Sequence, residues 1–420
     1  MRDIFIEILT TIKHNRLRTA LTGFSVAWGI FILIVLLGAG NGLINATMGN
    51  SSRYLSTSMV VSGGATSKAY DGLGENRDVQ LNDKDFNITS KGFPKNVETV
   101  GAELSQQGET LVNGSDYTTG VKLSGVYPND VEINKRTMIC GRFINELDLK
   151  ERRKSIVISS DMAKELLPQS PLSLNGQIIR TTTLAFRVVG IYESQKNSMG
   201  NDAFIPFTTF RAIYNKGDKT GNIVFSFSNL NSEAENEAFE SDYRARINRQ
   251  HRAAPDDENA IWIWNRFTQA LSMDTATGLL RTALWVIGIL TLISGIVGVS
   301  NIMLITVRER THEFGIRKAI GAKPWSILRL IIIESIVITT FFGYIGMVLG
   351  IAANLYMDAT IGQETIDNGL FAIQMFTNPT VGIDVCVKAT LLMIVAGTLA
   401  GMVPARKAAK IRPIEALRAE

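Results

Sequence analysis

Four long apolar segments divide the chain and predict membrane-spanning helices. Residues 19–52 and 282–307 carry no charged side chain, 330–357 carries only Glu334, and the charge-free segment 389–405 is 17 residues long. A helix needs about 20 mostly apolar residues to cross a bilayer, so the first three segments suffice alone. The fourth is long enough only if the helix includes flanking residues such as Lys388, whose amine can reach the lipid headgroups. We therefore expect transmembrane helices over 19–42, 281–306, 326–357 and 383–404.

The polar region between the first two segments, residues 43–280, has the patterns of an α+β domain. Short alternating runs bounded by turn residues predict strands, at 58–62, 97–104, 109–112, 117–124, 155–159, 186–192, 203–205 and 223–227. Helices are expected to start at Ser160, Pro206 and Ser232, the last with a capping box. The flanks, after residue 42 and from Phe267 onward, should continue the spans as a helical stalk. The strand-rich block 113–205 is a candidate for an inserted subdomain.

The distribution of Lys and Arg predicts the orientation of the spans. Residues 1–18 hold four, residues 308–329 six and residues 406–420 five, whereas 358–388 holds one. Positive residues favour the cytosolic side in short flanks. Both termini (1–18 and 405–420) and the segment 307–325 are therefore expected in the cytosol, with 43–280 and the short loop 358–382 outside. The net charge of +4 then reflects topology and does not indicate nucleic-acid binding.

The N-terminal segment has its own periodicity. Apolar residues recur at Ile4, Ile8 and Ile12 and basic residues follow, which predicts an amphipathic helix on the inner leaflet. The alternative is that these residues are the cytosolic start of the first span. A cleaved signal peptide is disfavoured because its apolar core should be about 7–15 residues long, far shorter than the run seen here.

The cytosolic segment between the second and third spans is a candidate coupling site, where another protein could push on the chain. Glu309, Glu313 and Arg317 recur at intervals of four, which on one helix would place opposite charges on one face. Small residues such as Gly315 and Gly321 would permit close backbone approach. An ordinary positive-inside loop explains the basic residues but not the small ones. The expected coupling residues are Arg308, Glu309, Arg310, Thr311, Glu313, Gly315, Arg317, Lys318 and Gly321.

Glycine pairs in the spans predict close helix packing. The small-residue pairs are Gly295 and Gly298, Gly346 and Gly350, and Gly397 and Gly401. Such spacing lets membrane helices approach each other closely, either within one subunit or between two. Glu334 is expected to pair with an arginine of the cytosolic segment or to reach the interface, rather than to serve an ion relay.

Catalytic chemistry is not expected of this chain. The sequence has no Gly-x-x-x-x-Gly-Lys-Ser/Thr, so no phosphate-cradling loop is predicted. Its three histidines are widely scattered, which disfavours a metal site. Two cysteines, Cys140 and Cys386, cannot form a disulfide framework. No cofactor is therefore expected, and ATP would be bound by a partner subunit.

Several motifs resemble the MacB/FtsX family of ABC transporter permeases, most closely the macrolide-exporter type. They are the segment 301–322, the terminal 404–417, and the weaker external matches 141–143, 186–191 and 205–206. The resemblance covers nearly the whole chain and implies a non-catalytic permease subunit with a periplasmic core domain in a bacterial inner membrane. One departure is that the macrolide exporter carries its ATPase fused at its N-terminus, and this sequence does not.

The resemblance also implies partners. These would be a cytoplasmic ABC ATPase, a second copy of the chain as a homodimer, a periplasmic adaptor and an outer-membrane channel, together forming a tripartite efflux system. Lipoprotein release, or FtsX-like signalling to a cell-envelope enzyme, would use the same mechanics and remain alternatives.

Overall fold

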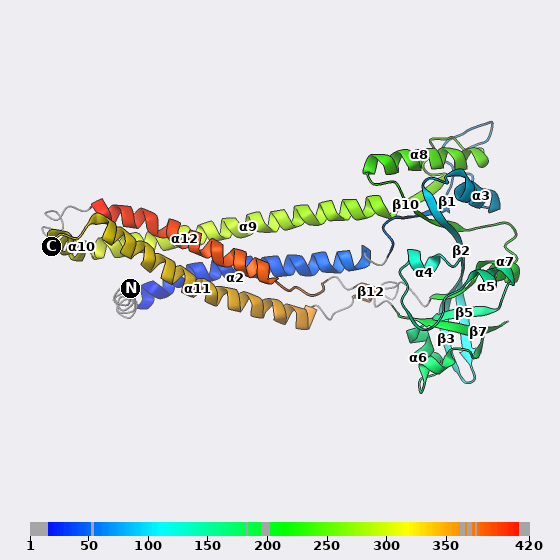
Figure 1. The fold of residues 1–420 in the computed structure, drawn as a ribbon, viewed down its shortest axis with the longest axis horizontal. Coiled ribbons are helices and arrows are strands. Elements are labelled where there is room, and N and C mark those ends of the chain that lie inside the picture. Colours follow the sequence, from blue (N-terminus) through cyan, green and yellow to red (C-terminus); the bar gives the residue numbers. More distant parts are fainter. Residues whose placement is uncertain are drawn as a thin grey trace. The chain divides into compact units, whose positions relative to one another are not determined.

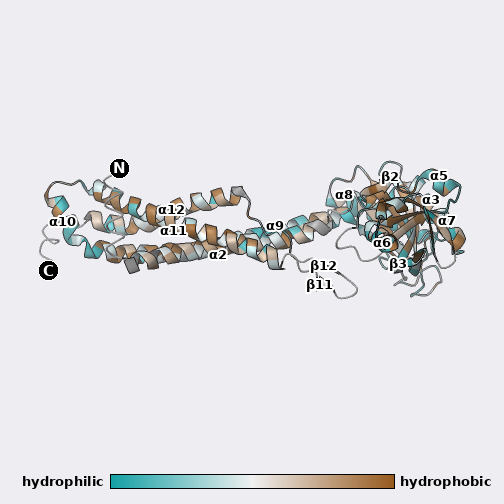
Figure 2. Ribbon diagram, turned by 90° about the horizontal axis from the view of Figure 1, so that it is seen from below, coloured by the Kyte–Doolittle hydropathy of each residue, from teal (hydrophilic) through white to brown (hydrophobic). Residues whose placement is uncertain are grey.

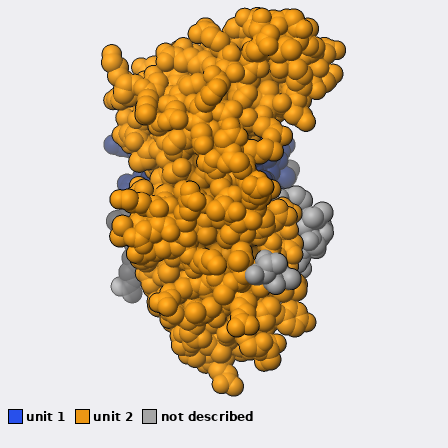
Figure 3. Space-filling model, turned by 90° about the vertical axis from the view of Figure 1, so that its right-hand side faces the viewer, with its two compact units in different colours: residues 1–47, 275–365, 374–420 blue, residues 48–274, 366–373 orange. Residues whose placement is uncertain are grey.

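The computed structural model describes residues 16–51, 54–181, 184–194, 202–361, 366–367, 372–373 and 376–410. The chain divides into two compact units (Figure 3). The first, here called the helical unit, comprises residues 1–47, 275–365 and 374–420. The second, here called the sheet unit, comprises residues 48–274 and 366–373. The predicted amphipathic segment, up to residue 15, and the end of the tail, 411–420, lie outside the described residues.

Long apolar helices make up the helical unit. Four helices are long and apolar enough to cross a membrane, with apolar stretches in 19–48, 266–309, 324–360 and 385–409. Figure 2 shows hydrophobic residues recurring along them. Many of their large apolar side chains are exposed, Phe24, Trp28 and Leu290 among them, as expected of surfaces that face lipid. The helices that form this unit are α10 (Thr311–Ala319), α11 (Pro324–Thr360), α12 (Ile383–Lys410) and most of α2 (Arg16–Ser51) and α9 (Arg266–Glu309), whose ends extend into the sheet unit.

Two of the glycine pairs bring α9 and α11 against α2. A Cβ added to Gly346 would collide with the backbone of Ala27 on α2. A Cβ added to Gly350 would lie 2.8 Å from the Cβ of Ile34, which is also on α2. On α9, a Cβ at Gly295 would lie 3.1 Å from the carbonyl oxygen of Ser25, and Gly298 adjoins the same serine. These contacts all form within one chain.

The third pair packs α12 on α11. A Cβ on Gly401 would lie 2.8 Å from the Cβ of Ser335, and one on Gly397 would collide with the hydroxyl of Thr339. The Ser335 hydroxyl donates a hydrogen bond of 2.8 Å to the carbonyl of Gly397, so close approach also lets a polar group bridge the helices.

A ten-stranded mixed sheet forms the centre of the sheet unit. The strand order is β10-β1-β9-β2-β3-β8-β5-β7-β4, with β6 pairing to β2 and β7. The strands are β1 (Ser58–Gly63), β2 (Val97–Asn113), β3 (Asp116–Val126), β4 (Met138–Gly141), β5 (Ser155–Ser159), β6 (Ile178–Arg180), β7 (Ala185–Tyr192), β8 (Asp202–Pro206), β9 (Asn222–Phe227) and β10 (Ile261–Asn265). The helices are α3 (Asp83–Gly92), α4 (Asp130–Ile133), α5 (Glu146–Lys150), α6 (Ser160–Leu166), α7 (Phe207–Ile213) and α8 (Glu233–Gln250), with a 3₁₀ turn at Pro171–Leu174. A short β11 (Ile366–Asp367) pairs with β12 (Ala372–Ile373).

Among the hydrophobic clusters along this sheet, two are large. One packs α3 and α8 beside β1, β9 and β10 and includes Phe225 and Tyr243 (Figure 1). The other packs α6 and α7 against β3, β5, β7 and β8 and includes Phe186 and Phe210. Strand β2 pairs with β9 at its start and with β3 further along, so one strand joins both parts. Whether residues 113–205 fold independently stays a prediction.

Each predicted strand falls on an observed one, but two of them form the single strand β2, and β4, β6 and β10 were not predicted. We expected separate strands at 97–104 and 109–112, but a single strand spans 97–113. The residues between them, Gln106 to Gly108, form an irregularity in the pairing with β3, where Gly108 has a positive φ of 84°. A polar run with glycine is typical of a turn, and here it is a β-bulge. Helix α8 begins after Ser232 with the predicted capping box.

Candidate functional site

The predicted coupling segment begins at an interruption of the helix. Helix α9 ends at Glu309, Arg310 has a non-helical ψ of 11°, and α10 starts at Thr311. The expectation that Glu309, Glu313 and Arg317 share one face of one helix is therefore wrong, because Glu309 lies on the preceding helix. The expectation of a short charged helix between two long apolar ones is confirmed.

Arg310 connects this junction to the interior of the helical unit. Its Nε lies 2.9 Å from a carboxylate oxygen of Glu313, and its Nη1 lies 3.4 Å from Oε2 of Glu334 on α11. Its guanidinium also lies 5.3 Å from the centre of the Phe314 ring. Glu334 is buried, at 5% exposure. The carboxylate thus pairs with an arginine of the segment between the second and third apolar helices, one of the two arrangements that the sequence favoured.

Phe314 fixes α10 to the ends of the long helices. Its side chain is buried in a cluster that includes Val307 of α9, Ile331 of α11 and Ala405 of α12. Lys318 strengthens this attachment, since its amine donates a hydrogen bond of 2.5 Å to the carbonyl of Ala409. Because α10 is packed against three helices, a force applied to it would reach all three.

Gly321 ends α10 for a conformational reason. Its φ is +100°, its N–H bonds to the carbonyl of Lys318, and the N–H of Ala322 bonds to the carbonyl of Arg317. This is the Schellman arrangement, which favours glycine at this position. No atom of this chain lies within 4 Å of a Cβ built on Gly321, so the glycine is explained here by its conformation, and its predicted close approach to another protein stays a prediction. Gly315, by contrast, is buried.

The outer surface of the segment combines exposed apolar and basic side chains. Ile320 is 82% exposed and Trp325 70% exposed. A hollow of ≈ 440 Å³ is lined by Trp325 together with Arg317, Lys323 and Arg329 and four further residues. Large apolar side chains exposed among charges are typical of protein-binding surfaces. We define this surface, with Ile320 and Trp325 at its centre, as the coupling surface.

The remaining predicted coupling residues differ in their exposure to solvent. Arg308, Glu309 and Glu313 are exposed, and Thr311 is partly buried with its hydroxyl donating to the carbonyl of Val307. Sequence reasoning missed Phe314, Ile320 and Trp325. The signal was available for the last two, since each is a large apolar residue between charged ones outside any predicted span.

Comparison with known families gives two matches that together span most of the chain. A model of the MacB-like periplasmic core domain matches residues 19–246. A model of the FtsX-like permease C-terminal region matches residues 285–413, which includes the coupling surface.

Individual relatives are similar over almost the whole chain. The macrolide export ATP-binding/permease protein MacB of Chlorobaculum tepidum is 27% identical, over 99% of this chain and 61% of its own length. The uncharacterized ABC transporter permease YknZ of Bacillus subtilis is 25% identical, over 98% of both chains. The chain thus spans about three-fifths of the MacB relatives and nearly all of YknZ.

Two solved structures resemble parts of the chain. The periplasmic region of MacB from Actinobacillus actinomycetemcomitans covers 54% of this chain and 96% of its own, with 18% identity and a TM-score of 0.43. The extracellular domain of YknZ from Gram-positive bacteria covers 50% of this chain and 100% of its own, with 16% identity and a TM-score of 0.40.

Proposed function

Because the chain belongs to the family of permeases that join a MacB-like periplasmic core domain to an FtsX-like C-terminal region, we propose that it couples ATP hydrolysis to work on the outer side of a membrane. The ATP would be hydrolysed by a protein or domain outside these 420 residues. One observation carries the proposal. Helix α10 is packed on the ends of three long apolar helices, yet beside it Ile320 and Trp325 are exposed.

Helix α9 supplies a mechanical route in this proposal. It is a single helix of 44 residues, from Arg266, directly after strand β10, to Glu309, directly before α10. At 1.5 Å per residue its length is about 66 Å, roughly twice the hydrocarbon thickness of a bilayer. A displacement of its α10 end would therefore be delivered to the sheet unit without a flexible linker in between.

The topology and assembly form part of the same proposal. The four apolar helices would span a bacterial inner membrane with both termini in the cytosol, and the sheet unit would lie in the periplasm. Two copies of the chain would associate with an ABC ATPase, a periplasmic adaptor and an outer-membrane channel, and would export a substrate. The MacB relatives are named as macrolide export proteins, which supports export as the activity.

Substitution of Ile320 by Asp tests the coupling step. The side chain is 82% exposed, so the change removes little packing within the chain. It should reduce co-purification of the ATPase with the full chain at least tenfold, since it places a charge at the centre of an apolar contact. The measurement is the amount of ATPase recovered, together with the ATP turnover of the complex in nanodiscs.

A matched control is Leu172→Asp, which adds the same charge at an apolar side chain of the sheet unit that is 51% exposed. Recovery and turnover should be unchanged in this variant. Equal recovery of the ATPase with Ile320→Asp and with the wild type would show that the coupling surface is misassigned.

A further inference from the structure

A basic hollow in the sheet unit suggests a binding site separate from the coupling surface. Its volume is ≈ 530 Å³, and its lining includes four cationic side chains, Arg142, Arg153, Lys154 and Arg187. The size is within the range of ligand sites. The four cations come from the ends of β4, β5 and β7, so the topology of the sheet gathers residues that are up to 45 positions apart in sequence.

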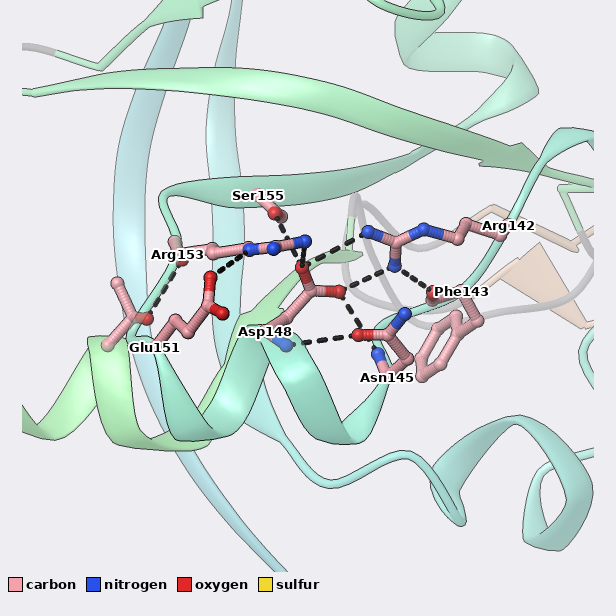
Figure 4. Close-up of polar contacts among 8 residues, drawn as sticks. Arg142, Phe143, Asn145, Asp148, Glu151, Arg153 and Ser155 are labelled. Carbon is pink, nitrogen blue, oxygen red and sulfur yellow. Dashed lines mark hydrogen bonds and ion pairs between the residues drawn. The ribbon is translucent and has the colours of Figure 1, made fainter.

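A buried carboxylate holds two of these cations in place (Figure 4). Asp148 is fully buried, and its two oxygens lie 2.5 and 3.1 Å from the guanidinium nitrogens of Arg142. Arg153 lies 3.8 Å from the same carboxylate. The Ser155 hydroxyl donates to Asp148 at 3.2 Å, and the N–H of Asn145 donates at 3.1 Å. Both arginine side chains remain more than 40% exposed. Asp148 therefore fixes their orientation, while the outer nitrogens of each guanidinium stay accessible to a ligand.

The other two cations are exposed, and Arg187 lies on the face of the sheet opposite α6. Strand β7 alternates, with Phe186 and Val188 buried in the core and Arg187 exposed on the opposite side. The N–H of Arg187 donates to the carbonyl of Lys154, which places the two residues side by side. In the described part of the chain, neither side chain has an acidic partner within 4 Å, whereas Arg153 pairs with Glu151 at 2.8 Å. The hollow therefore carries surplus positive charge.

Apolar side chains border this charge. Ile178 on β6 pairs in register with Arg187 and is 58% exposed, and Ala185 and Val189 share the face of β7 that carries Arg187. A ligand that fits must offer carboxylates to the guanidinium groups and apolar side chains to Ile178. A peptide that alternates acidic and apolar residues has this chemistry, and arginine forks suit carboxylates geometrically.

We infer that the hollow formed by Arg142, Arg153, Lys154 and Arg187 is a docking site for an acidic, partly apolar peptide segment of another protein. Charge complementarity is the argument for this occupant. Asp148 acts here as a positioning residue, because it touches the arginines and is itself buried. The site shares no residue with the coupling surface, so either proposal can fail without the other.

The test uses the full chain in nanodiscs of neutral lipid and a fluorescein-labelled eight-residue peptide of alternating Glu and Leu. Fluorescence anisotropy should show saturable binding that a Lys-Leu peptide of the same length does not reproduce. In the double variant Lys154→Glu/Arg187→Glu the Kd should rise at least tenfold. Both side chains are exposed, so the fold should be retained.

The control is Lys164→Glu, on α6 at the opposite face of this part of the sheet, whose side chain is 65% exposed. It should leave the Kd unchanged. Absence of saturable binding, or equal binding by the wild type and the double variant, overturns the proposal. Displacement of the peptide by millimolar inorganic phosphate, or preferential binding of phosphatidylglycerol vesicles at the same residues, would identify a phosphate-bearing ligand and likewise overturn the peptide assignment.

Discussion

At the scale of single residues, Asp148 shows how the sheet unit combines a buried charge with local structure. It is the third residue of α5, where its side chain accepts the N–H of Asn145 while the Asn145 side chain accepts the N–H of Asp148. The same carboxylate accepts from Arg142 and Ser155. One side chain therefore caps a helix and orients a cation, which explains why a short helix of five residues is held firmly beside the sheet.

The titration of Asp148 gives a testable pH dependence. Burial alone would raise its pKa, but hydrogen bonds from Arg142 and Asn145 outweigh that effect and hold the pKa below the ordinary 3.8. A carboxyl whose folded pKa is lowered contributes stability that is present above the unfolded value and is lost as pH falls through the folded value. The unfolding temperature of the full chain in detergent should therefore fall as pH decreases below about 3.8.

Replacement of Asp148 by Asn should remove its pH-dependent contribution to stability. Asp148→Asn leaves Arg142 without its buried counter-charge, so we expect the free energy of unfolding to fall by about 3 kcal/mol at neutral pH. The unfolding temperature of this variant should also depend less on pH in the acidic range. Asp161→Asn is the comparison for the size of the loss, since that side chain is 58% exposed and its ion pair with Lys164 lies on the surface, where such pairs contribute at most about 1 kcal/mol. An unchanged pH profile in Asp148→Asn would contradict this role.

At the scale of elements, helix contacts depend on glycine where backbones meet. Gly346 of α11 faces the backbone of Ala27 on α2, so a methyl group there must push the helices apart. Gly278 lies in α9 with no atom within 4 Å of an added Cβ. Comparing an alanine substitution at Gly346 with one at Gly278 therefore distinguishes the effect of a methyl group on helix packing from its effect on helix propensity.

Gly346→Ala should destabilise the chain by about 1–3 kcal/mol, the usual range for overpacking. Gly278→Ala should be neutral or stabilising by up to about 1 kcal/mol, because Ala favours helices over Gly. Thermal unfolding of both variants in the same detergent measures the difference. Similar unfolding temperatures would mean that α2 and α11 do not meet at Gly346.

Sequence patterns predicted these elements well where periodicity is strong. Strand β5 has the predicted bounds, 155–159, because three β-branched apolar residues, 156–158, lie between two serines and all five residues are buried. Helix α3 was missed because its ten residues are mostly polar, and it is held by a capping box with Asp85 where Glu or Gln is usual. Strand β10 was also missed, although its Ile-Trp-Ile-Trp run was a usable signal.

The candidate coupling site was predicted less completely, since it depends on contacts between distant segments. The charged helix and the pairing of Glu334 could be inferred from spacing and from the cost of an unpaired buried charge. The interruption at Arg310 could not be inferred, because residues 305–314 contain neither proline nor glycine and are compatible with a continuous helix. The partners of Gly346 and Gly397 likewise required the three-dimensional arrangement of the helices.

At the scale of the whole molecule, coupling requires that an event at the coupling surface displaces the sheet unit. Spin labels at Lys164→Cys in the sheet unit and Tyr356→Cys in the helical unit would report this, in a background with Cys140 and Cys386 replaced by Ser. Both labelled side chains are largely exposed, at 65% and 72%. The chain would be measured in nanodiscs together with its ATPase.

The most direct measurement is the distance distribution between these labels by pulsed electron paramagnetic resonance, with and without ATP and orthovanadate. We predict that ATP shifts the distribution in the complex, and that Ile320→Asp abolishes the shift. A distribution that ATP leaves unchanged in the wild-type complex, or one that shifts equally in Ile320→Asp, would contradict the account.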